Sequence, residues 1–207
     1  MGHAHAEHAP VEYNDTQFGK ASPGKIGMWL FLVTDAMSFS GFLIAYAVLR
    51  ATSANWPEPA KALGGVELSG FMTFLLICSS VSMVLTIDAC KQRNRKAMLN
   101  WLLFTIFGGA SFLSIQMYEY SHLIGHMGMS FNSYAHGSSL FASTFFSITG
   151  FHGLHVLSGV IYLIVMYIHA RRGDFDNGDY NMLEIAGLFW HFVDLVWILV
   201  FTFVYLL

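Results

Sequence analysis

One stretch decides the fold of this chain: Thr149-Gly150-Phe151-His152-Gly153-Leu154-His155-Val156-Leu157-Ser158-Gly159. It lies in an apolar run from Leu140 to Ile168, long enough to cross a bilayer, because a span needs about 20 mostly apolar residues. Its two histidines are three residues apart, so they share one helix face. The glycines around them let another helix backbone approach closely in a membrane. The stretch predicts a central packing helix whose imidazoles face protein rather than lipid.

The composition places the whole chain in the membrane class. Of its 207 residues, 55% are hydrophobic and 11% are charged, whereas a soluble domain carries about 25% charged residues. The net charge of −3 says little about partners, and no nucleic-acid partner is expected.

The apolar runs predict an all-α, polytopic membrane protein built as a bundle of five transmembrane helices. A polar tail over residues 1–24 contains His3, His5 and His8 and precedes the membrane domain, residues 25–207. Prolines in the loop 50–68 and glycines in the loop 122–136 are expected to break helices there. The five spans are expected at about 26–49, 68–90, 97–121, 138–170 and 182–207.

The distribution of lysine and arginine predicts the orientation. Eight of them fall on the side of the N-terminus and two on the other side, and basic residues concentrate in cytoplasmic loops. The N-terminus is therefore expected in the cytoplasm and the C-terminus in the periplasm, with the chain in the bacterial cytoplasmic (inner) membrane.

Several ionisable side chains fall at similar depth inside the predicted membrane, where such groups normally face protein. We expect them to meet, with Asp35 bonded to the fourth span through His155 or, as second choice, His152. His191 and Asp194 are three residues apart and are expected to touch. A static hydrogen-bonded cluster, a proton-related role and a metal or haem site all remain open. The predicted buried cluster is Asp35, His152, His155, His191, Asp194 and Glu184.

Five segments in order resemble one known family, subunit III of the haem–copper oxidases, over about residues 25–207. The opening stretch matches its signature, and Trp190-His-Phe-Val-Asp-x-Val-Trp197 resembles its last helix, with Glu184 seven residues before His191. Shorter matches are Gly27–Ala36, Leu76–Ser80 and Gln116-x-x-Glu119-Tyr120. The chain resembles the five-helix form of the family.

The resemblance implies a non-catalytic accessory subunit, with no catalytic residues and no metal of its own. Subunit I, the main contact, would hold the haems and copper that reduce oxygen to water, and subunit II and other respiratory subunits would lie nearby. The family is expected to support proton uptake and to bind structural phospholipid, here through Arg171, Arg172 and Trp190. Glu119 is expected as an interface or loop carboxylate. The family usually has glutamate where this chain has Asp35.

Two other functions stay open at this point. One is a subunit-III-like protein associated with nitric oxide reductase, and the other is a stand-alone haem b electron carrier that would use histidines on facing helices as axial ligands. The neighbouring chains of the complex and the absorption spectrum of the isolated chain distinguish them from an oxidase subunit.

Overall fold

The computed structural model describes residues 22–134 and 137–207. The tail histidines His3, His5 and His8 and the end of the 122–136 loop lie outside the described residues. The helices are α1 (Pro23–Thr52), α2 (Pro59–Ala62), α3 (Glu67–Lys91), α4 (Arg95–Gly125), α5 (Ser139–Arg172) and α6 (Asn181–Val200), which continues as the π-helix η1 (Phe201–Leu206). Two short strands, β1 (Met129–Ser130) and β2 (Ser133–Tyr134), form a hairpin.

The predicted all-α class and its five spans are confirmed. Five helices of the described chain are long and apolar enough to cross a membrane: α1, α3, α4, α5 and α6 with η1. Local signals set the ends of these helices. At the start of α1, the Ser22 hydroxyl oxygen accepts a hydrogen bond from the backbone N–H of Lys25. Pro23 occupies the first helical position, where the N–H that proline lacks would have no partner within the helix. At the end of α5, Gly173 takes the left-handed conformation (φ 95°) that favours glycine.

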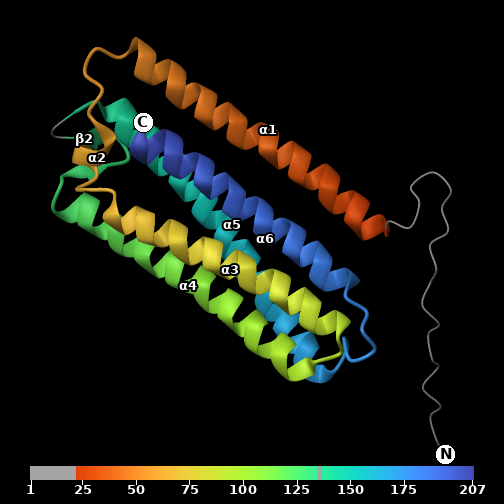
Figure 1. Ribbon diagram of the computed structural model, residues 1–207. Helices are drawn as coiled ribbons and strands as arrows, with labels where there is room; N and C mark the ends of the chain where they lie inside the picture. Colours follow the sequence, from red (N-terminus) through yellow and green to blue (C-terminus); the bar gives the residue numbers. More distant parts are fainter. Residues whose placement is uncertain (1–21, 135–136) are drawn as a thin grey trace, which may run out of the picture.

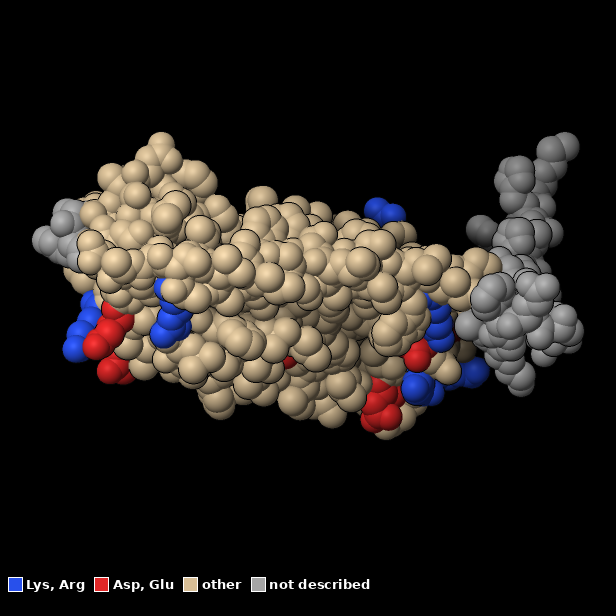
Figure 2. Space-filling model, turned by 90° about the horizontal axis from the view of Figure 1, so that it is seen from above, with Lys and Arg blue, Asp and Glu red and all other residues tan. Residues whose placement is uncertain are grey.

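The helices form an elongated bundle in which α1 stands at one edge (Figure 1). Helices α3 and α4 pack side by side, α6 contacts α3, α5 and α1, and α1 packs mainly on α5 and α6. Charged side chains gather at the two ends of the bundle, and the surface between them is almost entirely uncharged in the view of Figure 2. A membrane-spanning bundle requires this distribution.

Both predicted loops contain regular structure that the sequence analysis did not predict. In the first, Pro59 starts the single turn of α2, because proline is tolerated at a helix N-terminus. In the second, α4 continues through Gly125, and Gly128 (φ 61°) instead makes the turn that leads into the hairpin. The sharp change of direction in this loop therefore lies at Gly128, where the backbone has a positive φ, and not at Gly125.

A tryptophan of α6 contacts three other helices within the core. Trp190 of α6 is 1% exposed, and its indole N–H donates to Ser79 Oγ of α3 at 3.1 Å. Its ring lies against Gly109 of α4 and Gly159 of α5, where an added Cβ would lie 2.4 and 2.9 Å from ring atoms. The two glycines thus provide the space that the indole fills.

Candidate functional site

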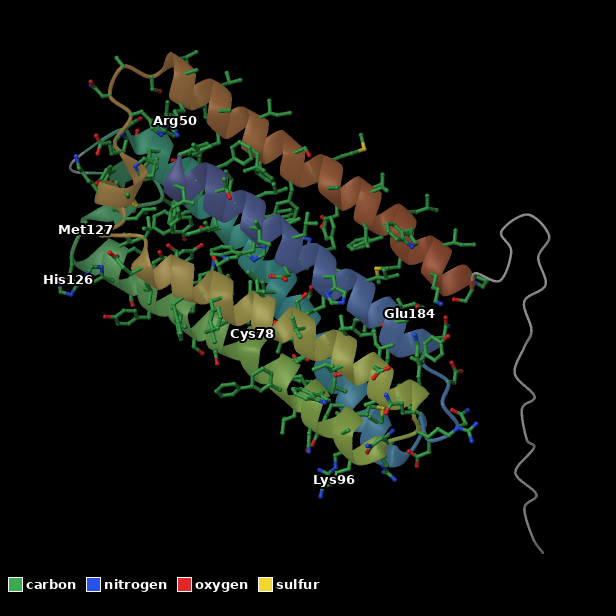
Figure 3. All side chains as sticks on the ribbon, viewed as in Figure 1. Arg50, Cys78, Lys96, His126, Met127 and Glu184 are labelled. Carbon is green, nitrogen blue, oxygen red and sulfur yellow. The ribbon has the colours of Figure 1, made fainter. Side chains whose placement is uncertain are left out.

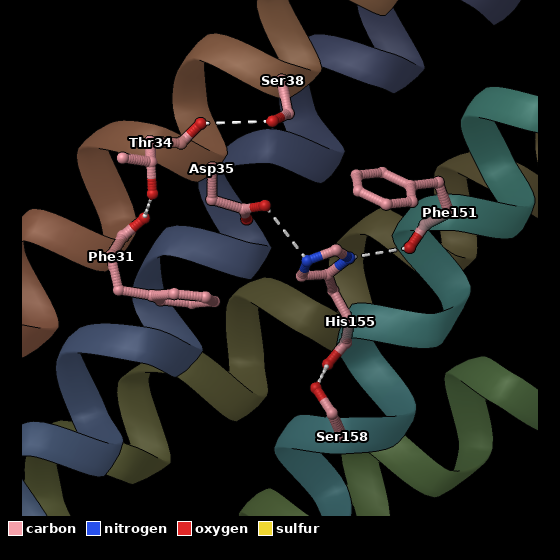
Figure 4. A network of polar contacts seen from close by, with 7 residues as sticks. All are labelled: Phe31, Thr34, Asp35, Ser38, Phe151, His155 and Ser158. Carbon is pink, nitrogen blue, oxygen red and sulfur yellow. Dashed lines mark hydrogen bonds and ion pairs between the residues drawn. The ribbon is translucent and has the colours of Figure 1, made fainter.

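The central polar contact of the bundle joins α1 to α5. Asp35 Oδ1 lies 3.2 Å from His155 Nε2, with the Asp35 side chain buried (8% exposed) and the His155 side chain partly buried (15% exposed) (Figure 4). His155 Nδ1 lies 2.8 Å from the carbonyl oxygen of Phe151, one turn earlier in α5. The partner of Asp35 is the histidine that the sequence analysis names first.

The two contacts of His155 restrict where the protons of the pair can lie. The Phe151 carbonyl can only accept, so Nδ1 must carry a hydrogen and donate it. A hydrogen bond between Nε2 and the Asp35 carboxyl then requires one further proton, placed on either atom. In both arrangements, imidazolium with carboxylate or imidazole with carboxylic acid, the pair is neutral overall. The membrane interior thus contains no isolated charge at this point, where one would be costly.

Aromatic rings surround this pair. The ring of Phe39 on α1 lies 5.2 Å from that of His155, and the ring of Phe151 lies 4.6 Å from it, both centre to centre. Asp35 Oδ2 is buried and has no hydrogen bond within the described chain. The pair is therefore a contact between two helices in which the carboxyl is buried and the imidazole is partly covered by aromatic rings.

The other histidine of the opening stretch lies apart from this pair. His152 is fully buried, with its ring 4.9 Å from that of Trp197 and 5.6 Å from that of Phe112. Neither of its ring nitrogens has a hydrogen bond among the described residues. Although His152 and His155 share a broad helix face, His152 points into the aromatic core and His155 points toward α1.

His191 and Asp194 do not form the pair that their spacing predicts. His191 Nδ1 lies 2.6 Å from Ser80 Oγ of α3. Asp194 is 7% exposed, and its Oδ1 is buried without a hydrogen bond in the described part of the chain. No hydrogen bond or ion pair of the described residues joins His191 to Asp194, because the neighbouring helix α3 supplies the closer partner for the imidazole.

Glu184 lies outside the predicted buried cluster. It occupies the first turn of α6, at the end of the bundle labelled in Figure 3, and forms an ion pair with Lys25 of α1. One turn away, the Ser22 hydroxyl donates to Asn181 Oδ1 at 2.9 Å. Including Glu184 in the cluster was wrong, because its position near a helix end lets it reach a lysine rather than the membrane interior.

The predicted lipid-binding residues separate into two groups. Arg171 and Arg172 are exposed at the end of α5, and neither forms an ion pair with a described residue. Trp190 was wrongly placed with them, because its ring is buried between glycines of α4 and α5 and presents almost no surface to an acyl chain. The motif that contains Trp190 marks a packing position.

Sequence reasoning missed a second buried polar group that joins α4 to η1. Glu119 is 6% exposed, and the hydroxyl of the fully buried Tyr205 donates to its Oε2 at 3.0 Å. Glu119 is therefore not an interface or loop carboxylate, since α4 continues past it to Gly125. The hydrogen bond links residues 86 positions apart, a separation that no local pattern reveals.

Further polar contacts on the same part of α4 reach α5. Gln116 Nε2 donates to the Thr149 carbonyl at 2.8 Å, and Tyr120 Oη lies 2.7 Å from Thr149 Oγ1. Gln116, Glu119 and Tyr120 are spaced three and four residues apart, so their polar side chains share one helix face. This spacing is the signal from which the cluster could have been predicted.

Replacing Tyr205 by phenylalanine should weaken the contact between η1 and α4. The change leaves the buried Glu119 carboxyl without its donor, which costs about 1–3 kcal/mol. We expect a lower melting temperature of the purified membrane complex. Glu119→Gln is the matched control, because its side-chain oxygen still accepts the tyrosine hydrogen; equal melting temperatures for Tyr205→Phe and the unchanged chain would show that the bond is unimportant.

Comparison with known proteins identifies the family. The family model for cytochrome c oxidase subunit III matches residues 14–207. The chain belongs to this family. It is 36% identical to cytochrome c oxidase subunit 3 of Alkalihalophilus pseudofirmus, covering 88% of this chain and 85% of that protein. It is 33% identical to quinol oxidase subunit 3 of Bacillus spizizenii, over 98% of this chain and 97% of that protein.

Family membership confirms two predictions made from the motifs. The chain is an accessory subunit of a haem–copper oxidase, and it is a membrane protein of the respiratory chain. A third relative, cytochrome c oxidase subunit 3 of Synechocystis, is 37% identical over 87% of this chain and 74% of its own length. Relatives named for cytochrome c and for quinol are similarly distant, so identity does not separate the two electron donors.

Proposed function

We propose that this chain is a non-catalytic subunit III that packs against the subunit holding the oxygen-reducing centre and keeps it stable during turnover. The observation that carries the proposal is the Asp35–His155 contact. Both histidine nitrogens are engaged within the chain, so this polar pair joins α1 to α5. A pair used in this way supports a structural role better than a reaction at this position.

The proposal includes a specific distribution of cofactors. The haems and copper would lie in partner subunits, with subunit I as the main contact and subunit II nearby, and this chain would bind structural phospholipid alone. Support comes from three histidines of the predicted spans: His155 contacts the Phe151 carbonyl and Asp35 through its two nitrogens, His191 bonds Ser80, and His152 is enclosed by aromatic rings.

Purification of the native complex through a tag on this chain tests the proposal. We expect it to bring down a haem–copper subunit I, and we expect the chain, once separated by detergent, to show no haem absorption band. A haem band that stays with the separated chain would refute the proposal. Recovery of a nitric oxide reductase core in place of an oxidase would replace the proposed partner.

Replacing both Arg171 and Arg172 by glutamine should release bound phospholipid. Exposed arginines without carboxylate partners can clamp a phosphate through paired hydrogen bonds. We expect mass spectrometry of the purified complex to detect less anionic phospholipid. Lys96→Gln is the control, because Lys96 is also exposed and lies at the same end of the bundle (Figure 3). Equal lipid content in the arginine variant and the control would contradict the arginine clamp.

The positively charged turn between α3 and α4 should face the cytoplasm. Arg93 lies in this turn, and Lys91, Arg95 and Lys96 lie at the adjoining helix ends. Basic segments are retained on the cytoplasmic side of a bacterial inner membrane. A protease should cleave an engineered site at Arg93 only in inverted vesicles. Cleavage from the periplasmic side alone would reverse the proposed orientation, with the N-terminus outside.

A further inference from the structure

Two histidines lie one turn apart at the far end of α4. His122 and His126 have ring centres 5.1 Å apart, with their planes at 34°. The backbone N–H of His126 donates to the His122 carbonyl at 2.9 Å, so the helical spacing extends through both residues. Residues four apart lie on the same helix face, and Figure 3 places the His126 side chain at this end of the bundle.

Both imidazoles are available to a ligand. His122 and His126 are exposed, and neither has a side-chain hydrogen bond or an ion pair in the part of the chain that the structure describes. The 31 residues of α4 extend about 46 Å, which exceeds the roughly 30 Å of hydrocarbon in a bilayer. Its last turn can therefore lie in the aqueous headgroup layer, where ions have access.

We propose that His122 and His126 together bind a transition-metal ion that prefers imidazole nitrogen, such as Zn²⁺. A nitrogen–metal distance of about 2.0–2.1 Å to each ring, at a tetrahedral angle, separates the ring centres by about 5 Å. The observed separation of 5.1 Å matches this value. This proposal is independent of the oxidase assignment.

The surroundings of the two rings favour a cation. The C-terminal end of a helix carries partial negative charge from its free carbonyl groups. Tyr118, one turn before His122, lies with its ring nearly parallel to the imidazole, at 6.5 Å between ring centres and 25° between planes. No group of three or more His, Cys, Asp or Glu in the described chain could hold a metal, so water would complete the coordination.

Zinc binding to the intact oxidase complex tests this site. The background should carry His3, His5 and His8 replaced by alanine, which removes the tail histidines as competing ligands. After chelator treatment, equilibrium dialysis with radioactive Zn²⁺ should show that this background binds one exchangeable zinc ion more per complex than the same background with His122→Ala and His126→Ala. Removing one histidine alone should weaken binding of that ion about tenfold or more, because the second contact of a chelate is intramolecular.

A variant of unchanged composition provides the sharpest control. Exchanging Ser121 and His122 (S121H with H122S) keeps both imidazoles exposed but spaces them five residues apart, on different helix faces. We expect it to bind zinc as weakly as a single-histidine variant. His169 lies in the last turn of α5 and is paired with Asp174. Its replacement by alanine should leave zinc binding unchanged. The same zinc stoichiometry and affinity in the exchanged variant as in the parent would overturn the proposal.

Discussion

Asp35→Leu is expected to loosen the chain from the oxidase complex, whereas Asp35→Asn is expected to leave it assembled and active. Leucine leaves the partly buried His155 Nε2 without its partner, and an unsatisfied polar group of this kind costs about 1–3 kcal/mol. Helix α1 packs mainly on α5 and α6, so it has few other contacts to compensate. The measurement is the fraction of this chain that stays bound when the complex is purified in mild detergent.

Asparagine separates the structural role from a proton-related one. With His155 neutral and Nδ1 donating to Phe151, the asparagine N–H can donate to Nε2 and keep the contact without a transferable proton. Ser158→Ala controls for a change on the same helix, because that hydroxyl is exposed and bonds its own helix carbonyl. A sharp loss of proton pumping in a fully assembled Asp35→Asn complex would refute the structural account.

Gly109→Ala should destabilise the bundle at its centre. The added Cβ would lie 2.4 Å from Trp190 Cη2 and 2.7 Å from Val160 Cγ2, so α4, α5 or α6 must move. Overpacking of this kind costs about 1–3 kcal/mol. The melting temperature of the complex and the retention of the chain should both fall.

A second substitution tests the cause of that loss. Trp190→Phe removes the outer ring atoms that the new Cβ would meet, so it should harm the parent but partly rescue Gly109→Ala. Gly125→Ala is the control on the same helix, since nothing lies within 4 Å of its added Cβ. Additive losses in the double variant would show that Gly109 and Trp190 do not pack as described, because coupled neighbours deviate from additivity.

The sequence predicted the membrane-spanning helices and one contact between them, because hydrophobicity and residue depth determine both. Apolar length placed all five spans, since a bilayer imposes a minimum run on each helix. A carboxyl and an imidazole at matching depth also pointed to the contact between Asp35 and His155, because groups inside a membrane need partners.

Three of the wrong placements share a physical cause. Glu119, Trp190 and His191 each find a partner on another helix, and the direction in which a side chain points depends on helix rotation, which residue spacing does not determine. Trp190 packs against glycines of α4 and α5, His191 forms a hydrogen bond with Ser80, and Glu119 accepts one from Tyr205. The polar cluster on α4 is the one that could have been predicted, because the spacing of Gln116, Glu119 and Tyr120 puts them on one helix face.

In the proposed role, this chain supports the oxidase without taking part in oxygen reduction. The decisive measurement is the initial rate of oxygen consumption per haem in the complex after this chain has been removed. We expect an initial rate close to that of the intact complex, followed by faster loss of activity during turnover. An initial rate near zero that returns when the chain is added back would contradict it.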